Sequence, residues 1–293
     1  MRLDKFMAVS MPELSRSYIQ KLIQDGLVQV DSKPGKASLK VAAGSSVIFE
    51  VPDAQEPEIL PEDIPLDIVY EDDDVIVVDK PKGMVVHPSA GHYTGTLVNA
   101  LLYHCAGGLS GINGVMRPGI VHRIDKDTTG LLVACKNDFS HNEIAGQLRE
   151  HSITRKYQAV VWGNFNEDEG TVDRNIGRHP SDRKKMAVVR QGGREAVTHY
   201  RVLERFDGSS YIECRLETGR THQIRVHMAS IGHPVMGDAV YGRIREKTPM
   251  HLEGQTLHAG VLGFAHPRTG GYMEFEAELP QYFSELLEKL RGN

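Results

Sequence analysis

The stretch RPGIVHRIDKDTTGLLVAC occupies residues 117–135 and sets the architecture of the larger part of this chain. Its first half is polar and turn-forming, whereas residues 131–135 are apolar and read as a buried strand. Loops at the ends of rigid strands often carry reactive groups. Basic residues on either side of Asp125 favour its ionised form, which makes it a candidate catalytic carboxylate. The structural alternative is a capped turn built by Asp127 and Thr128.

Around this stretch, short β-like runs outnumber helical patterns. The expected strands are Val75–Val78, Gly130–Ala134, Tyr157–Val161, Ala196–Leu203, Tyr211–Leu216 and Tyr272–Ala277. The expected helices are Thr96–Tyr103, Phe139–Glu150, Gln223–Ile231 and Tyr282–Leu290. This mixture predicts an α+β fold built on a mixed, largely antiparallel sheet with a central cleft.

The segment 1–52 forms a separate small unit. Ser15 is expected to N-cap a helix over Arg16–Gln24, and a shorter helix over Arg2–Ala8 precedes it. A unit of this size has a thin core and is more often a binding accessory than a catalyst. Short strands are expected at Val28–Val30 and Val47–Val51.

Charge is distributed unevenly along the 293 residues, whose net charge is −5. Residues 53–74 carry 10 acidic residues and no Lys or Arg, and proline recurs among them. We therefore expect an extended acidic linker over 53–66, followed by a catalytic domain over 67–293. Residues 178–227 carry 11 Lys/Arg against 6 Asp/Glu, a local excess that suits phosphate binding.

Composition excludes several classes of protein. A chain that is 40% hydrophobic and 25% charged is globular rather than disordered or fibrous. No apolar run approaches the roughly 20 residues that span a bilayer, and no secretory signal is visible, so we expect a cytoplasmic protein. Cys105, Cys135 and Cys214 lack Cys-x-x-Cys spacing, which predicts reduced, buried thiols and no structural zinc.

The second informative stretch is LETGRTHQIRVH at residues 216–227. Thr221 is the expected N-cap of a helix, and Arg220 stands at its start, where it can pair with a carboxylate from elsewhere. His222 and His227 are five residues apart and face different sides of a helix, so structural roles are favoured over a metal site.

Four segments, taken together, resemble one family. They are VDKPKGMVVHP at 78–88, HRIDKDTTG at 122–130, RKYQA at 155–159 and GRTHQIRVH at 219–227. Their order is similar to that of RNA pseudouridine synthases of the RluA branch, and residues 2–51 resemble an S4-type RNA-binding domain. Residues 179–188 resemble the synthase D subfamily, which acts on the 23S RNA of the large ribosomal subunit.

The resemblance implies a cofactor-free and metal-free isomerase. Asp125 matches the catalytic aspartate, which attacks C1′, adds to the base or takes a sugar proton. Arg220 matches the arginine that pairs with it, and Tyr157 matches the active-site tyrosine. From the strand pattern alone, Tyr157 is a half-buried packing residue.

The resemblance also implies base flipping. Arg123 matches the residue that fills the place of the extruded uridine, and Ile224 lines the uracil pocket. The expected partner is ribosomal RNA or the large-subunit particle, with the helix 69 stem-loop as target, and the protein is expected to be a monomer. Candidate phosphate contacts are Arg2, Arg16, Lys82, Arg183, Lys184 and Lys185.

Two other functions compete with this interpretation. The small basic unit and the basic region are also typical of a non-catalytic RNA-binding factor in ribosome assembly. Asp125 and Asp127 resemble the paired carboxylates of a glycosidic-bond hydrolase. In an extended segment, however, these two side chains point to opposite sides and do not face one substrate.

Overall fold

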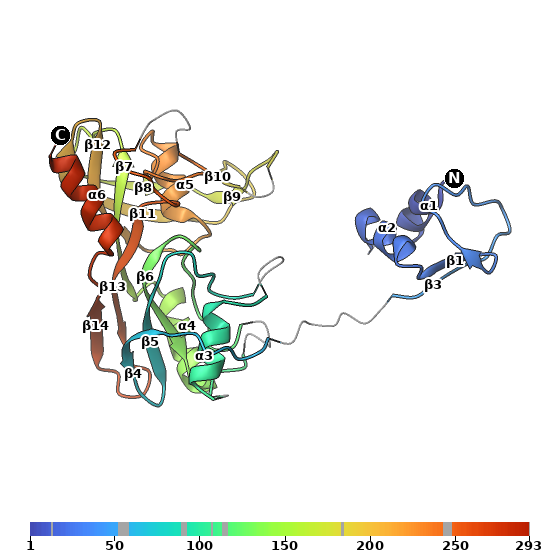
Figure 1. Cartoon of the computed structure of the whole chain (residues 1–293), viewed down its shortest axis with the longest axis horizontal. Helices are drawn as coiled ribbons and strands as arrows, with labels where there is room; N and C mark the ends of the chain where they lie inside the picture. Colours follow the sequence, from blue (N-terminus) through green and yellow to red (C-terminus); the bar gives the residue numbers. More distant parts are fainter. Residues whose placement is uncertain are drawn as a thin grey trace. The chain divides into compact units, whose positions relative to one another are not determined.

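The computed structural model of the chain contains two compact units, Met1–Pro57 and Glu58–Asn293 (Figure 1). It describes residues 1–12, 14–51, 59–88, 93–106, 108–112, 117–182, 185–242 and 248–292. Within these ranges, no helix is both long enough and apolar enough to cross a bilayer.

The smaller unit packs two helices on a small sheet. Its elements are α1 (Leu3–Ser10), α2 (Arg16–Gln24), β1 (Val28–Val30), β2 (Lys33–Pro34) and β3 (Val47–Phe49). The strands pair antiparallel in the order β2-β1-β3. The Ser15 hydroxyl accepts a hydrogen bond from the Tyr18 amide at 3.2 Å, which confirms the predicted N-cap of α2. Leu3 and Ile19 are fully buried in the core between the helices and β1.

A buried carboxylate in α1 orders two of the arginines that we predict to contact RNA. Asp4 accepts hydrogen bonds from Arg16 Nη2 at 2.7 Å and from Arg2 Nε at 3.0 Å. The Arg16 bond, together with those from Gln20 and Arg2, holds the pKa of Asp4 well below its ordinary value. Both arginine side chains stay about half exposed, so the pairing fixes their positions and leaves them accessible.

The larger unit is built on one mixed sheet, which confirms the predicted fold class. Its strands are β4 (Asp67–Glu71), β5 (Val75–Lys80), β6 (Thr129–Cys135), β7 (Thr154–Trp162), β8 (Glu169–Asp173), β9 (Ile176–Arg178), β10 (Met186–Val188), β11 (Val197–Phe206), β12 (Ser209–Leu216), β13 (Leu257–Ala265) and β14 (Tyr272–Glu276). Its helices are α3 (Leu97–His104), α4 (Asp138–Arg149), α5 (Gln223–Ser230) and α6 (Gln281–Arg291).

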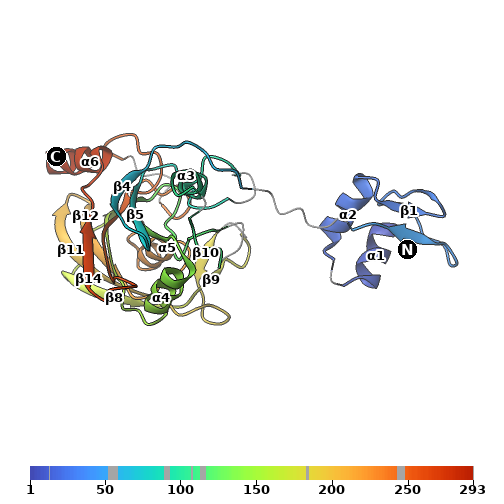
Figure 2. The same ribbon diagram turned by 90° about the horizontal axis from the view of Figure 1, so that it is seen from below.

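Among the described residues, the strand order of the main sheet is β4-β5-β6-β13-β7-β12-β11-β8, with β14 paired to β13 and β9 and β10 forming a separate pair. The β6–β13 pair is parallel and the other pairs of the main sheet are antiparallel. Apolar residues alternate between the two faces of the central strands. Ile76 and Leu132 pack with α3 and α5, whereas Val77 and Leu131 pack with α4 on the other face. Figure 2 shows α3 and α5 on the same side of the sheet, and Figure 1 shows α6 beside β7 and β12.

The described part of the predicted linker 53–66 packs on the larger unit. Residues 52–58 lie outside the described residues, but the following residues pack on α3. Ile59 is 7% exposed, and the Asn99 side chain donates to the Leu60 carbonyl at 2.8 Å. The backbone of Glu62 also bonds to that of Asn99, so proline and charge did not keep this part away from the domain.

The cysteines follow the prediction in two of three positions. Cys135 in β6 and Cys214 in β12 are fully buried, and burial raises the pKa of the Cys135 thiol to about 12. Cys105 follows α3 and is only half-buried, so its predicted full burial was wrong.

Gly130 allows the only parallel pairing of the described sheet to form. A Cβ on Gly130 would lie 2.3 Å from the Ala259 carbonyl oxygen in β13, and its φ of 109° is unfavourable for other residues. The close approach of β6 to β13 matters for function because β6 follows directly after the loop that contains Asp125.

We predict that Gly130→Ala lowers the free energy of unfolding of the larger unit by about 3 kcal/mol or more, from backbone strain together with overpacking. Gly192→Ala is the matched control, since Gly192 has a φ of 73° and open space around it. The control should lose only about 1–2 kcal/mol. Urea unfolding measures both, and equal losses would contradict the role given to the Ala259 contact.

Candidate active site

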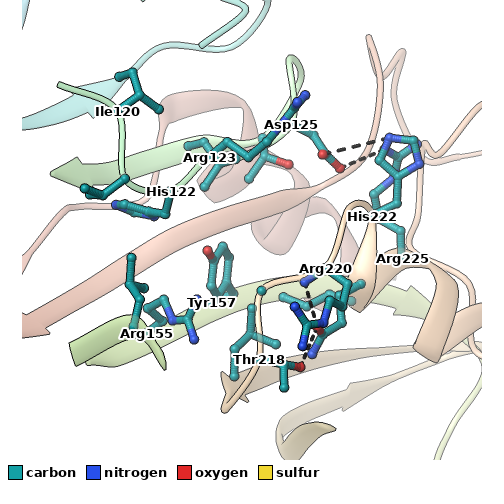
Figure 3. Close-up of a pocket in the computed structure, with 18 of the residues that line it drawn as sticks. Ile120, His122, Arg123, Asp125, Arg155, Tyr157, Thr218, Arg220, His222 and Arg225 are labelled. Carbon is teal, nitrogen blue, oxygen red and sulfur yellow. Dashed lines mark hydrogen bonds and ion pairs between the residues drawn. The ribbon is translucent and has the colours of Figure 1, made fainter. Parts of the chain in front are cut away.

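A cavity of about 690 Å³ opens between the loop before β6 and the turn between β12 and α5 (Figure 3). This volume is typical of ligand-binding cavities. Its walls include His87, segments 120–125 and 216–225 and the start of β7, so it brings together all four segments that carry the family resemblance.

The cavity is strongly cationic, although the chain as a whole is acidic. Among the described residues that line it, Asp125 is the only carboxylate. The lining arginines are Arg117, Arg123, Arg149, Arg155, Arg194, Arg220 and Arg225. Such a concentration of positive charge attracts an anionic ligand.

The loop that carries Asp125 is fixed by contacts to buried strands. His122 Nε2 accepts the Val133 amide at 3.1 Å, and burial lowers the pKa of this histidine to about 3. Lys80, whose side chain is fully buried, donates from Nζ to the Lys126 carbonyl at 3.1 Å. The polar loop is thus held on each side of Asp125 by groups that belong to the sheet.

Arg225 lies between two carboxylates. Its Nη1 donates to Asp125 Oδ2 at 2.8 Å, while its Nε and Nη2 donate to the two oxygens of Asp238 at 2.7 and 3.0 Å. Burial alone would lower the pKa of Arg225, but the two carboxylates raise it above its ordinary value. Burial opposes ionisation of Asp238, yet Arg225 holds the pKa of that carboxyl below its ordinary value.

The predicted pairing of Arg220 with Asp125 is wrong. Arg220 lines the cavity, but its Nε donates to the Glu195 carbonyl at 2.8 Å. The helix starts at Gln223 as predicted, but its N-cap is His222 and not the predicted Thr221, and the Gln223 side chain accepts the Arg220 amide at 2.9 Å. This leaves Arg220 in the preceding turn, whereas Arg225 extends from the first turn of α5.

A sequence signal for Arg225 existed and was missed. It is the second arginine of the 216–227 stretch, and Asp238 is an acidic residue in apolar surroundings, which requires a cationic partner. The two are only 13 positions apart.

His222 lies beside the Asp125 carboxylate. Its Nε2 is 3.9 Å from Asp125 Oδ1, and its Nδ1 is 2.9 Å from the Tyr241 hydroxyl. The same hydroxyl accepts a hydrogen bond from the Met186 amide at 2.8 Å, which fixes the phenol beside the imidazole. Burial lowers the pKa of His222, and its φ of 57° marks a strained backbone at the cavity wall.

Tyr157 occupies the opposite wall, on β7. It is 7% exposed, lines the cavity and lies within electrostatic range of both Asp125 and Arg155. Burial raises its pKa, which keeps the hydroxyl protonated at neutral pH. Arg155 was not singled out from the sequence, although the two-residue period of a strand puts it on the same face as Tyr157.

Arg123 and Ile224 also line the cavity. Arg123 is exposed, and its Nη1 donates to His87 Nε2 at 3.3 Å. Burial lowers the pKa of His87 to about 4, so this imidazole is neutral at pH 7 and can accept that bond. Ile224 is 4% exposed and belongs at once to the cavity wall and to the core around α5.

Among the described residues of the larger unit, Lys82 and Lys185 were predicted to contact phosphate, and neither lines the cavity. Arg183 and Lys184 lie outside the described residues. Lys82 Nζ lies 3.8 Å from the centre of the Tyr282 ring. The backbone of Lys185 bonds to Asp182 and its side chain is half-buried. Asp127 does not line the cavity either, which gives the paired-carboxylate hydrolase no geometric support.

Outside the cavity, one group in the described ranges has the spacing of metal ligands. Asp72, Asp74 and His266 lie within 4.8 Å of one another. Arg268 Nε donates to Asp74 at 2.6 Å, and His266 Nε2 is 2.7 Å from Asp72. Each ligand already has a protein partner, so this cluster works as a clamp between the β4–β5 and β13–β14 hairpins.

Comparison with known proteins gives consistent matches. Residues 74–230 match the family model of RNA pseudouridylate synthases, and residues 1–47 match that of the S4 domain. "Uncharacterized RNA pseudouridine synthase YlyB" of Bacillus subtilis is 54% identical over 100% of this chain and 95% of its own. "Ribosomal large subunit pseudouridine synthase D" of Zymomonas mobilis is 48% identical over 99% of this chain and 93% of its own. The solved structure of human RNA Pseudouridylate Synthase Domain Containing 1 has a TM-score of 0.59 at 26% identity, covering 78% of this chain and 96% of that one.

The buried imidazole of His122 predicts a pH dependence of stability. Its pKa is about 3 in the folded chain and about 6.5 in an unfolded one, so its stabilising contribution is complete above pH 6.5 and is lost as pH falls towards 3. Between pH 7.5 and 5 this group should remove about 2 kcal/mol.

His122→Gln keeps an acceptor for the Val133 amide and should flatten the decline in unfolding free energy over this pH range. His251→Gln, at an exposed histidine, is the matched control. Parallel declines in wild type and His122→Gln would exclude His122 as the source.

Proposed function

The chain belongs to the family of RNA pseudouridine synthases, and from this membership we propose that it converts specific uridines of 23S ribosomal RNA into pseudouridine at the Asp125 cavity. The named relative from Zymomonas mobilis supports the large ribosomal subunit as substrate. The helix 69 stem-loop is the target we propose, on the subfamily resemblance of residues 179–188. The protein acts as a cytoplasmic monomer on the RNA or on the large-subunit particle.

The observation that carries this proposal is one carboxylate in a cationic cavity. RNA brings a phosphate at every nucleotide, and arginines at the mouth of the cavity meet that charge. The buried uridine must leave its stack to reach Asp125, at a cost of a few kcal/mol. Contacts between the cavity and the extruded nucleotide offset that cost.

The reaction needs a positioned carboxylate and no net redox change. The N1–C1′ bond breaks with its electron pair moving to the uracil, the ring turns, and a C5–C1′ bond forms. The C5 proton leaves and N1 gains a proton, so the product is an isomer of the substrate. Arg225 holds Oδ2 of Asp125, and the carboxylate lines the cavity into which the reacting nucleotide enters.

Tyr157 and Arg123 serve the extruded nucleotide. The Tyr157 ring stacks on the uracil, as aromatic rings do on unstacked bases. The Tyr157 hydroxyl is protonated at neutral pH, because burial raises its pKa. Tyr157 therefore assists removal of the C5 proton by hydrogen bonding and does not act as an ionised phenolate base. Arg123 is exposed at the cavity mouth, and its planar guanidinium can stack where the uridine was.

The S4 unit supplies additional RNA affinity. Arg2 and Arg16 are fixed by Asp4 and partly exposed, which reduces the entropy that they lose on meeting phosphates. Residues 1–47 match the S4 domain model, and the similarity to the Bacillus subtilis relative extends over this unit as well as the larger one.

We predict that Asp125→Asn lowers isomerisation by roughly 10³-fold or more, because it removes the only carboxylate among the described residues that line the cavity. Release of tritium from C5-labelled uridine in 23S RNA measures the rate. Asp127→Asn is the matched control and should stay active. Turnover by Asp125→Asn at the wild-type rate would sink the proposed function and favour an RNA-binding assembly factor.

We predict that Arg225→Gln and Arg220→Gln change different kinetic constants. The first removes the donor that orients Asp125 and should lower kcat by roughly 10²-fold or more. The second removes a cavity arginine without a carboxylate partner and should mainly raise KM. Steady-state kinetics separate the two effects, with melting temperatures to verify folding. A larger kcat loss in Arg220→Gln would restore the pairing that the sequence suggested.

A further inference from the structure

A second buried guanidinium lies in the cavity and has no part in the Arg225 ion pairs. Arg155 is 5% exposed and lines the cavity from β7, two residues before Tyr157. Alternating residues of a strand share a face, and Figure 3 shows the two side chains next to each other.

Arg155 lacks the counter-charge that buried arginines normally have. Its Nη2 donates to the Glu217 carbonyl at 2.7 Å, and its buried Nε has no hydrogen-bond partner in the part of the chain described. No carboxylate within those ranges forms an ion pair with it, in contrast to Arg225. Burial lowers its pKa, as expected for an uncompensated buried cation. A charge in this state is costly, and it is stabilised when an electron-rich ligand arrives.

Gly219 makes room for this guanidinium. A Cβ on Gly219 would lie 2.7 Å from Arg155 Nη1. The turn before α5 therefore approaches Arg155 as bare backbone. The result is a built donor site, closed on one side by the turn and open on the other to the cavity.

Because Arg155 is buried deep in the cavity, it is placed to contact the base of the nucleotide rather than its phosphate. Phosphates stay on the outside of an RNA strand, where the exposed arginines of the cavity mouth can reach them, whereas the flipped base enters the pocket. Tyr157 lies close enough to Asp125 and to Arg155 for the charges of both groups to affect the pKa of its hydroxyl. A uracil stacked on Tyr157 with C1′ at Asp125 therefore directs its far carbonyl edge to Arg155.

We propose that Arg155 is a further catalytic residue, whose guanidinium donates hydrogen bonds to a carbonyl oxygen of the uracil and stabilises the base when the N1–C1′ bond breaks. This inference rests on the proposed function. The electron pair of the broken bond delocalises over N1 and the carbonyl oxygens, and it returns to the ring framework when C5 bonds to C1′. The charge on the base is transient, so the interaction strengthens as the N1–C1′ bond breaks and stabilises that transition state.

The same donor can serve the base before and after its rotation. Turning uracil by half a turn about its N3–C6 axis exchanges N1 with C5 and also exchanges O2 with O4. A carbonyl oxygen therefore occupies the same place at the start and at the end. A fixed guanidinium in that place keeps the detached ring in the cavity while it turns.

The test is single-turnover kinetics of Arg155→Gln at saturating RNA, with the dissociation constant measured in parallel. We expect the isomerisation rate to fall roughly 100-fold with RNA affinity changed less than about threefold. Arg155→Lys, which keeps the charge, should recover about tenfold. Lys156→Gln is the matched control, since it removes a cation from the other face of β7, and it should keep the wild-type rate.

Two further measurements keep the test decisive. With 4-thiouridine at the target position, the poorer sulfur acceptor should shrink the factor between wild type and Arg155→Gln, which a merely structural role would not change. If Arg155→Gln fails to fold, Gly219→Ala displaces the guanidinium and should give the same rate loss. If the wild type is active and the rate of Arg155→Gln lies within threefold of the wild-type rate, the role of Arg155 is refuted and the proposed function stands. If the wild type itself does not isomerise uridine, the proposed function is refuted.

Discussion

The candidate site depends on the buried guanidinium of Arg225, which is shared between Asp238 and Asp125. The fork of two bonds to Asp238 fixes the plane of the guanidinium, and the remaining Nη1 then fixes Asp125. A buried cation between two carboxylates is stable only when each group is satisfied. The carboxylate is therefore oriented before any substrate binds, which is the condition for efficient electrostatic catalysis. Every other part of the cavity is arranged around that fixed oxygen.

The sheet supports this arrangement through contacts that are not visible in any one motif. Gly130 lets β6 approach β13, and His122 and Lys80 fasten the Asp125 loop to the adjacent strands. Acidic and basic residues are also segregated along the chain. Acidic residues are concentrated at 53–74, which leaves a cavity lined by arginines in a chain of net charge −5. Binding of an anionic polymer is thus compatible with an acidic composition.

Local patterns predicted most of the fold, and pairing between distant segments limited the rest. The expected strands and helices lie within three residues of the observed bounds, but β2, β4, β8, β9, β10 and β13 were not predicted. In β13, Gly260 and Gly263 interrupt the strand pattern. Asp125 and Tyr157, which both line the cavity, could be singled out from the sequence because they lie in motifs that are specific to one enzyme family. The partner of Asp125 was misassigned, because the stretch 216–227 offers two arginines and the local pattern does not show which of them the fold brings to the carboxylate.

A double-mutant cycle on Arg225→Lys and Asp238→Asn, with single-turnover isomerisation of 23S RNA as the readout, tests the central role of the Asp238–Arg225–Asp125 ion chain most directly. If Asp238 acts only by orienting Arg225 for Asp125, each variant alone should lose most of the rate, and the double variant should lose no more than the worse single one. Losses that multiply in the double variant would mean that the two residues act independently, which contradicts the ion chain as the organising element of the site.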